Sequence, residues 1–340
     1  MTPIIPSTKL LVVNVHKLQA TSCSRYYFWM YVLNMIPKGF NTNFWWGSVL
    51  GEGVEVVLAT KSIDKAIKAM RVKHEEELKD QLLTPGVSEE VDFQLKMLEI
   101  IVTVWAKVRL KYIKSVEITA SESKFSVELS QSPIIFTGTL DGEGKADHED
   151  TMFEIKSASS QSLNSEYFAH LQFDKQINGY KAGMLKSGRP SFSTCHYLVF
   201  RKPQIQVKKT ETPDEFLDRL RADLEARADW YYIHYKHRFG KMATNDVLQD
   251  IEGITFDLFS KYSYLTTTQL LDPYNWPRND RQCFNFGICP YFRLCANCKK
   301  YPLYMKAFKQ RELRYDLEDR ELDKTRALTK SVSKIKREKD

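Results

Sequence analysis

One short segment, Gly138–Lys156, constrains the fold of this chain more than any other. It begins with an expected turn that carries Asp141, and it ends in a strand-like run that carries Glu154 and Lys156. Because side chains alternate between the two faces of a strand, Glu154 and Lys156 project to the same side, while the hydrophobic residues beside Glu154 point into a core. The pattern therefore predicts that two carboxylates and an ammonium group converge on one spot.

This set of side chains suits metal-dependent chemistry. Mg²⁺ and Mn²⁺ prefer oxygen ligands, so Asp141 and Glu154 can supply two of them and leave positions open for water and a phosphate. Lys156 would then orient or deprotonate an attacking water. The pattern is short, however, and a solvated strand edge with a salt bridge is the alternative interpretation.

A helix expected over Ser165–Leu185 adds two polar side chains to this site. Gln176 and Tyr180 are four residues apart and therefore share one face of the helix. The chain thus carries three motifs in order, which are Gly138-Thr-Leu-Asp141, Glu154-Ile-Lys156-Ser157 and Gln176-Ile-Asn-Gly-Tyr180. This ordered set resembles the signature of RecB-type nucleases in the PD-(D/E)XK superfamily.

The resemblance implies an α/β fold with a restriction-endonuclease-like core, in which a central mixed β-sheet is flanked by helices. It also implies a helical N-terminal segment and a C-terminal Cys-rich segment. By the same resemblance, the ligands of one or two Mg²⁺ or Mn²⁺ ions are Asp141, Glu154 and the carbonyl group of Ile155. The catalytic positions that it implies are Asp141, Glu154, Lys156, Gln176 and Tyr180.

The cysteines form a second group of candidate ligands. Four of the six lie close together near the C-terminus, at Cys283, Cys289, Cys295 and Cys298. A disulfide framework is not expected in a large chain without a secretory segment, so this crowding indicates a metal site. Structural Zn²⁺ held by these four thiolates is one interpretation, although only the last two form a Cys-x-x-Cys pair. Buried cysteines without a ligand role are another interpretation.

Cys23 extends the resemblance to the other end of the chain, because it precedes the aromatic run Ser-Arg-Tyr-Tyr-Phe-Trp. In the iron-sulfur branch of the family, an exonuclease branch known from phages and CRISPR adaptation, such a Cys joins three Cys that follow the nuclease core. The resemblance therefore implies a four-cysteine clasp around a [4Fe-4S] cluster, with the ligands Cys23, Cys283, Cys289 and Cys295. Cys298 would be the spare thiol, and Cys195, beside an apolar run, is expected in the core.

The chain departs from the family pattern at one position. Many relatives carry Gly-x-x-x-His near the N-terminus, with the His as a metal ligand, whereas the nearest match here is Gly51-Glu-Gly-Val-Glu55. Glu55 could supply an oxygen ligand instead, or it could be a surface residue. Glu52 and Glu117 are weaker acidic candidates. The departure leaves an inactive DNA-binding relative open as an alternative.

Composition frames these expectations without deciding them. The 340 residues are 43% hydrophobic, which is enough for one large core or two modest ones, and no apolar run approaches the roughly 20 residues of a membrane span. No membrane contact is therefore expected. The start of the chain lacks the layout of a signal peptide, so we expect a place in the cytoplasm, and the resemblance implies that of a bacterial or phage-infected cell. The net charge of +7 suits a polyanionic partner, and the resemblance implies that this partner is DNA, single-stranded or as duplex ends. Protein partners in a DNA-processing complex are a further expectation.

Hydrophobic periodicity predicts the order of elements. Helices are expected over Cys23–Met35, Trp45–Met70, Asp92–Lys114 and Pro213–Arg238, the last with Thr212 as cap and with His234 and His237 near its end. Short strands are expected over Val116–Thr119, Phe125–Leu129, Ile134–Thr139, Met152–Lys156, Thr194–Arg201 and Ile205–Lys208. The aromatic residues at helical spacing, Trp29 and Trp45 among them, are expected in the core.

With no internal repeat and no low-complexity linker, we expect a single PD-(D/E)XK nuclease domain over residues 1–305. It would consist of a helical N-terminal part (1–115), a catalytic core (116–240) and a helical, Cys-bearing part (241–305). Residues 306–340 are expected to form a charged helical tail.

The expected activity is that of a Mg²⁺- or Mn²⁺-dependent DNA nuclease. An exonuclease that hydrolyses DNA phosphodiester bonds in replication, recombination or repair is the leading hypothesis. The alternatives are a catalytically weak or inactive DNA-binding subunit of a DNA-processing complex, and an RNA-directed nuclease.

Overall fold

The computed structural model describes residues 11–310 apart from 80, 82, 130–133, 160–162, 190 and 285–286, and apart from the side chains of 241–243. The chain divides into two compact units. Within the described residues, the larger unit comprises 11–22 and 39–266, and the smaller unit comprises 23–38 and 267–310. The expected tail lies outside the described residues except for its first few positions.

The larger unit is built on a six-stranded mixed sheet. Its strands are β1 (Leu11–Asn14), β3 (Val116–Glu128), β4 (Ile134–Ala146), β5 (Glu149–Ala158), β6 (Thr194–Arg201) and β7 (Tyr232–Arg238). The order is β1-β4-β5-β6-β7, and β3 pairs with β4 along most of its length. The β1–β4 and β5–β6 pairs are parallel and the other pairs are antiparallel, so the predicted central mixed sheet is confirmed.

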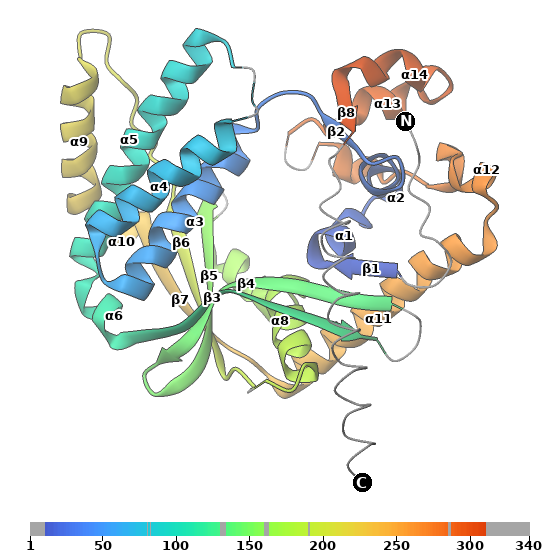
Figure 1. Ribbon diagram of the computed structural model, residues 1–340, viewed down its shortest axis with the longest axis horizontal. Helices are drawn as coiled ribbons and strands as arrows, with labels where there is room; N and C mark the ends of the chain where they lie inside the picture. The colour runs from blue at the N-terminus through green and yellow to red at the C-terminus, as the bar shows by residue number, and fades with distance from the viewer. Residues whose placement is uncertain are drawn as a thin grey trace, which may run out of the picture. The chain divides into compact units, whose positions relative to one another are not determined.

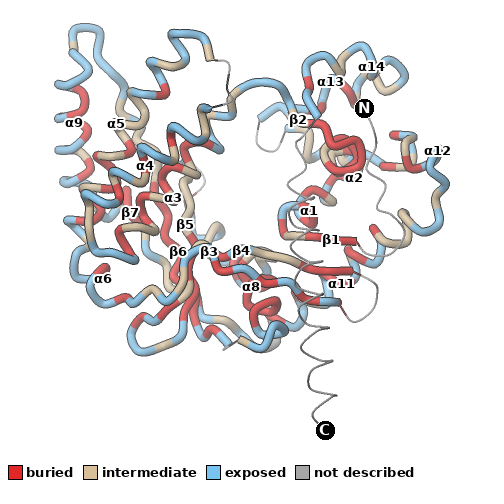
Figure 2. The backbone as a smooth tube through the Cα atoms, in the orientation of Figure 1, coloured by how far each residue is buried: buried red, intermediate tan, exposed pale blue. Residues whose placement is uncertain are grey.

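Helices cover both faces of this sheet (Figure 1). One layer consists of α3 (Thr42–Thr60), α4 (Ile63–Leu78), α5 (Pro85–Val108), α6 (Leu110–Ser115), α9 (Pro213–Ala226) and α10 (Ala228–Tyr231). Its core includes Trp45 and Trp105, which pack in one cluster with Phe153 of β5 and Phe200 of β6. Figure 2 shows this buried interior along the strands and the inner sides of the helices. The predicted α/β class, with helices that flank the sheet, is therefore confirmed.

The remaining elements of the larger unit are α1 (Val15–Ala20), α7 (Ser165–Ala169), the 3-10 turn η3 (His170–Gln172), α8 (Lys175–Lys186) and α11 (Lys241–Tyr264). Helix α8 contacts β3 and β4 and packs against α11. Gly138 of β4 permits this approach, because a Cβ atom there would lie 2.5 Å from Phe125 and 2.8 Å from Tyr180. None of the described helices is long and apolar enough to cross a membrane.

Several predicted elements have different bounds in the structure. The helix expected over Trp45–Met70 is two helices, because Lys61 takes a left-handed conformation with φ of 60° and Ser62 then caps α4. The strands expected over Val116–Thr119 and Phe125–Leu129 are one strand, β3. The helix expected over Ser165–Leu185 is divided into α7, η3 and α8, with Asp174 as the cap of α8.

Two predictions about the segment after β6 are wrong in part. Residues 205–208 form no strand. The helix that begins at Pro213, with the predicted capping by Thr212, ends at Ala226, and the chain returns as strand β7, which pairs with residues 194–200 of β6. The pairing with β6 overrides the helical pattern, so His234 and His237 lie on a strand and not near a helix end.

The smaller unit joins a segment near the N-terminus to a C-terminal segment. From the first segment come α2 (Ser24–Tyr27), the π-helix η1 (Phe28–Val32) and β2 (Met35–Pro37). From the second come α12 (Thr267–Leu270), η4 (Pro273–Asn275), η5 (Asp280–Cys283), α13 (Phe292–Ala296), η6 (Cys298–Lys300), α14 (Tyr301–Tyr304), η7 (Met305–Ala307) and β8 (Phe308–Gln310).

Backbone pairing and aromatic packing hold these two segments together. Strand β2 pairs with β8 in antiparallel register. The ring of Trp276 stacks on Tyr27 and Phe28 at centroid distances of 5.7 and 6.1 Å, and the Tyr291 hydroxyl donates to the Met35 carbonyl at 2.6 Å. Trp29 is fully buried, so the predicted core role of the aromatic run is confirmed for this residue.

Candidate active site

The candidate site lies where strands β4 and β5 separate. Their pairing ends at Gly142 and Phe153, and β5 continues beside β6 as far as Ala158. Asp141 is the next residue on β4, inside a continuous strand and not at the turn that we expected. Its Oδ2 accepts a hydrogen bond from the Ile155 amide at 2.8 Å, just beyond the last backbone pair of β4 and β5. The divergence of the strands therefore positions the carboxylate.

Glu154 and Lys156 lie on the face of β5 that meets α8. Phe153 and Ile155, which alternate with them, pack with the core on the other face, as the spacing predicted. The Lys156 Nζ forms an ion pair with Glu154 Oε1. The Glu154 side chain has no exposed surface, whereas that of Lys156 is 31% exposed. Lys156 can therefore reach both the buried carboxylate and a molecule that arrives from solvent.

Helix α8 completes this network through Gln176. The Gln176 Nε2 donates to Glu154 Oε1 at 2.7 Å, and Gln176 Oε1 accepts from Lys156 Nζ at 3.2 Å. The same amide lies 3.4 Å from the Tyr180 hydroxyl. Asp174 fixes the start of the helix by accepting from the Gln176 amide at 2.8 Å. The structure thus brings together all five side chains that the sequence singled out.

Burial makes the charges of this site costly. It raises the pKa of Glu154 to about 8, an effect that the Asp141 charge increases and Lys156 opposes. Burial also raises the pKa of Asp141. Burial by itself lowers the pKa of Lys156, but Glu154 and Asp141 outweigh it, and the pKa of the ammonium is raised overall. Lys156 therefore stays protonated at neutral pH.

A further carboxyl group belongs to the same electrostatic site. Glu55 on α3 has its pKa raised to about 9, by burial first and then by the charge of Asp141. It lines an open cavity of about 690 Å³ between α3, α4 and β3. The charged residues around this cavity are Glu52, Glu55, Lys65, Lys68, Lys73, Glu76 and Glu122.

Two acidic residues on β3 differ from expectation. Glu117, a weak candidate from the sequence, is exposed and does not line the cavity. Glu122, which the sequence reasoning missed, lines the cavity and contributes to the raised pKa of Glu55. It has a φ of 47° within a strand that is irregular between Ile118 and Ala120. No motif marks such a position in the sequence.

The residues present fit a divalent cation in their chemistry. The second oxygen of Glu154, Oε2, is buried and has no hydrogen-bond partner. Carboxylates with raised pKa values, together with an orphaned oxygen, form the type of hard-oxygen environment that Mg²⁺ or Mn²⁺ prefers. Among the described residues, no group of three or more His, Cys, Asp or Glu side chains is arranged to hold a metal ion.

The cysteines of the smaller unit are all unpaired thiols. Backbone and indole groups donate to two of them, since the Asn279 amide lies 3.3 Å from the Cys23 Sγ and Trp29 Nε1 lies 3.2 Å from the Cys295 Sγ. The amide of Cys289 donates to the Cys283 carbonyl at 2.8 Å. The C-terminal Cys segment therefore folds against the segment that begins at Cys23.

The thiols also differ in their electrostatic surroundings. Burial raises the pKa of Cys295 to about 11, and Cys289 and Cys23 add to the rise. Burial and then Cys23 raise the pKa of Cys283. Cys298 instead accepts a hydrogen bond at its sulfur from Arg25 at 2.6 Å. Outside this unit, Cys195 is fully buried on β6, so its predicted core position is confirmed.

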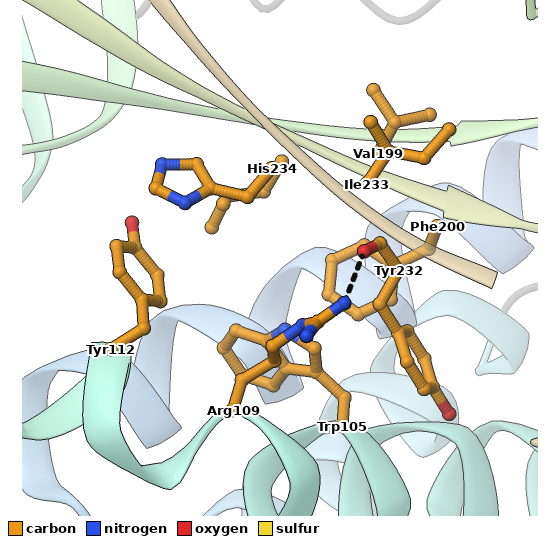
Figure 3. Close-up of a pocket in the computed structure, with 9 residues that line it drawn as sticks. Trp105, Arg109, Tyr112, Val199, Phe200, Tyr232, Ile233 and His234 are labelled. Carbon is orange, nitrogen blue, oxygen red and sulfur yellow. Dashed lines mark hydrogen bonds between the residues drawn. The ribbon is translucent and has the colours of Figure 1, made fainter. Parts of the chain in front are cut away.

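A separate cluster of titratable groups in the larger unit is structural. His196 Nδ1 lies 3.0 Å from the Tyr112 hydroxyl and 3.2 Å from His234 Nε2. The adjoining cavity, which Figure 3 shows with Tyr112, His234 and Arg109 at its wall, has a volume of about 10 Å³. This is room for about one water molecule. Burial, with the charge of His234, lowers the pKa of His196 to about 4, so its ring is neutral at pH 7.

His237 is a further buried histidine of the larger unit. It is 5% exposed on β7, and burial lowers its pKa.

No family model matches the chain, and no curated protein matches its sequence. Among solved structures, a candidate exonuclease from Eubacterium rectale is similar, with 10% identity and a TM-score of 0.42 over 74% of this chain and 80% of that chain. An alkaline exonuclease from Laribacter hongkongensis, solved also in complex with dAMP, is similar at 11–12% identity with a TM-score of 0.27, over 65% of this chain and 94% of that chain. Identities and TM-scores this low do not carry a function over to this chain.

Proposed function

We propose that this chain is a Mg²⁺- or Mn²⁺-dependent deoxyribonuclease that hydrolyses DNA phosphodiester bonds as an exonuclease in replication, recombination or repair. The proposal rests on one observation. Oε2 of Glu154 is buried without a hydrogen-bond partner, beside Asp141 and Lys156. A fully buried carboxylate oxygen without a partner is costly unless a cation compensates it. A catalytic divalent cation supplies that compensation.

The cation ligands in this proposal are Asp141, Glu154 and the Ile155 carbonyl, and Glu55 takes the place of the His that relatives carry. Glu55 qualifies because its pKa is raised to about 9 by burial and by Asp141, so a bound cation would favour its ionised form. A cation held by these groups would polarise a phosphate and would lower the pKa of a nearby water molecule.

Side chains of the protein position the attacking water and the phosphate. Lys156 stays protonated, so it donates hydrogen bonds to the attacking water or to a phosphate oxygen and does not act as the base. Gln176 holds Lys156 through Oε1 and Glu154 through Nε2, which fixes both relative to each other. Tyr180 supports that amide from one turn further along α8. The water oxygen then bonds to phosphorus as the bond from phosphorus to the 3′ oxygen breaks, and the proton that the water gives up ends on the 3′ oxygen, which leaves as a hydroxyl.

For the smaller unit we propose a [4Fe-4S] cluster held by Cys23, Cys283, Cys289 and Cys295, with structural Zn²⁺ as the alternative. No three of the described Cys side chains are arranged to hold a metal, and the proposal rests on two observations about their surroundings. The pKa of Cys295 responds to the charges of Cys289 and Cys23, and that of Cys283 responds to Cys23, so these thiols are electrostatic neighbours. The sulfurs of Cys23 and Cys295 already accept hydrogen bonds, which thiolate ligands favour.

Digestion of end-labelled linear DNA tests the proposed function. The wild type, purified anaerobically, should degrade DNA with Mg²⁺ or Mn²⁺ but not with a chelator, and Glu154→Ala should lose this activity. Glu117→Ala is the matched control, because Glu117 is an exposed carboxylate away from the site, and it should retain full activity. Resistance of closed circular DNA would identify an exonuclease.

Two outcomes would replace the proposal. Well-folded wild type that binds but does not cut DNA would identify a DNA-binding subunit. Faster cleavage of RNA than of DNA, at equal length and sequence, would identify an RNA-directed nuclease.

A further inference from the structure

The smaller unit contains an open cavity of about 610 Å³ that the proposed nuclease site does not use. Its volume lies in the range of ligand-binding sites. It is lined by residues of α2, η4, α13 and η6 and by the segments between them, and these residues are Arg25, Tyr274, Arg278, Cys295, Ala296, Asn297, Cys298, Lys299 and Lys300. Four cations thus surround it, and no Asp or Glu lines it.

Among the described residues, no carboxylate pairs with the cations that line this cavity. In the part of the chain that the structure describes, Arg25, Arg278, Lys299 and Lys300 form no ion pair with an Asp or Glu. Residues 23–38 and 267–310 contain nine Lys or Arg against two Asp and no Glu, a net charge of +7. This equals the net charge of the whole chain. An anion bound in this cavity would relieve the repulsion among these cations.

One aromatic ring gives the cavity a second kind of contact. The side chain of Tyr274 is 59% exposed, although the unit buries most of its aromatic rings. The guanidinium of Arg25 lies 5.6 Å from the centre of this ring, and Arg25 itself is only 6% exposed. Arg25 is held in place by two hydrogen bonds. Its Nε donates to the Trp276 carbonyl at 2.6 Å, and its Nη1 donates to the Cys298 sulfur. The cavity therefore combines a cation held by hydrogen bonds, exposed cations and an accessible ring.

We infer that this cavity binds single-stranded nucleic acid, with phosphates on Lys299, Lys300 and Arg278 and a base stacked on Tyr274. Backbone phosphates need cations along their path, and an unpaired base needs an aromatic face. A duplex offers no free base face, and an acidic peptide would not use the ring. The inference concerns binding alone, so it stands or falls independently of the proposed cleavage.

Binding of fluorescein-labelled oligothymidylate of about 12 nucleotides to the full-length protein tests the inference. The measurement uses the Glu154→Gln background, so that cleavage cannot remove the probe, and follows fluorescence anisotropy over a range of salt. Lys299→Glu/Lys300→Glu should weaken binding at least ten-fold and reduce the slope of log K against log salt by about 1.4, because about 0.7 is lost for each phosphate contact on a single strand.

The control double variant makes the same change of charge in the same unit. Lys306 and Lys309 are exposed and do not line the cavity, so Lys306→Glu/Lys309→Glu should leave the affinity nearly unchanged. Equal weakening by the two doubles would overturn the inference, because only net charge would then matter. If the first double fails to fold by circular dichroism, Lys299→Gln/Lys300→Gln replaces it.

The ring contact has its own variants. Tyr274→Ala should weaken binding about ten-fold without a change in the salt slope, and Tyr274→Phe should bind like the wild type. An abasic strand of the same length should bind wild type and Tyr274→Ala equally. No effect of Tyr274→Ala on oligothymidylate, or equal competition by polyglutamate, would overturn the assignment to nucleic acid.

Discussion

At the scale of single residues, the site is governed by the cost of burying carboxylates close together. Glu55 gives the clearest prediction, because its pKa is raised from 4.5 to about 9 without an ion pair to Lys156. Between these pH values the unfolded chain ionises this group while the folded chain keeps it protonated, so metal-free stability falls as pH rises. Glu55→Gln should therefore raise the melting temperature of metal-free protein at pH 8 by about 2–4 °C, an effect of about 1 kcal/mol after screening.

The pH dependence supplies the control for Glu55. Well below pH 4.5, the ordinary pKa of this group, both folded and unfolded forms carry a protonated Glu55, so Glu55→Gln and wild type should melt together. Mg²⁺ at pH 8 should raise the melting temperature of the wild type more than that of the variant. A variant that responds to Mg²⁺ like the wild type would remove Glu55 from the ligand set.

Lys156 gives the second residue-scale prediction. Lys156→Ala removes the cation that Gln176 and Glu154 hold, and activity on linear DNA should fall by about 10²–10³ fold. Lys156→Arg should not restore activity, because the planar guanidinium cannot replace a compact ammonium in this contact. Lys145→Ala, which removes an exposed lysine of β4, should cut like the wild type. If the kcat of Lys156→Arg were near the wild-type value, a positive charge at this position would by itself be sufficient for cleavage.

The sequence predicts part of this site because side chains on a strand alternate between its two faces. The alternation along β5 is a local property, so the sequence alone assigns Glu154 and Lys156 to one face of the strand. The position of Asp141 inside a strand could not be predicted in this way, because it depends on where β4 and β5 stop pairing. Glu122 could not be predicted either, since its place follows from an irregularity in the pairing of β3 with β4.

At the scale of elements, the contact between β4 and α8 decides whether Tyr180 and Gln176 reach the site. Gly138→Ala would place a Cβ atom 2.5 Å from Phe125 and 2.8 Å from Tyr180, so the helix or the ring must move. Overpacking of this kind costs about 1–3 kcal/mol. Both the free energy of unfolding and nuclease activity should decrease, as measured by urea denaturation and by digestion of linear DNA.

Gly142→Ala is the matched control on the same strand. A Cβ atom there would meet Phe153 at 3.6 Å, an ordinary contact, so stability should change little. Equal losses in both variants would point to the flexibility of glycine in β4 and not to the approach of α8.

The element bounds show which sequence signals are local. Thr212 and Pro213 start α9 as predicted, because capping depends on neighbouring residues only. The predicted end of that helix is wrong, because the residues of β7 form a strand by pairing with β6. Strand β6 lies more than thirty residues earlier in the chain, so no local signal marks this pairing. Helical composition in Tyr232–Arg238 is overridden by that pairing.

At the scale of the whole molecule, each compact unit draws on distant parts of the sequence. The smaller unit joins 23–38 to 267–310, and no linker composition marks its limits. If Cys23 is a ligand together with Cys283, Cys289 and Cys295, the bound metal ties these two segments and adds to the folding free energy. Cys23→Ser should then lose iron and lower the melting temperature of this unit.

Cys298→Ser is the matched variant for this test. The Cys298 sulfur accepts a hydrogen bond from Arg25, a role that a serine hydroxyl can take over, so this variant should keep the iron content and the melting temperature of the wild type. Iron, acid-labile sulfide and zinc would be measured in the same anaerobic samples. Iron with sulfide in wild type and Cys298→Ser but not in Cys23→Ser supports the cluster. Zinc retained in Cys23→Ser and lost in Cys298→Ser would instead assign the site to the four C-terminal thiols, because only that ligand set excludes Cys23.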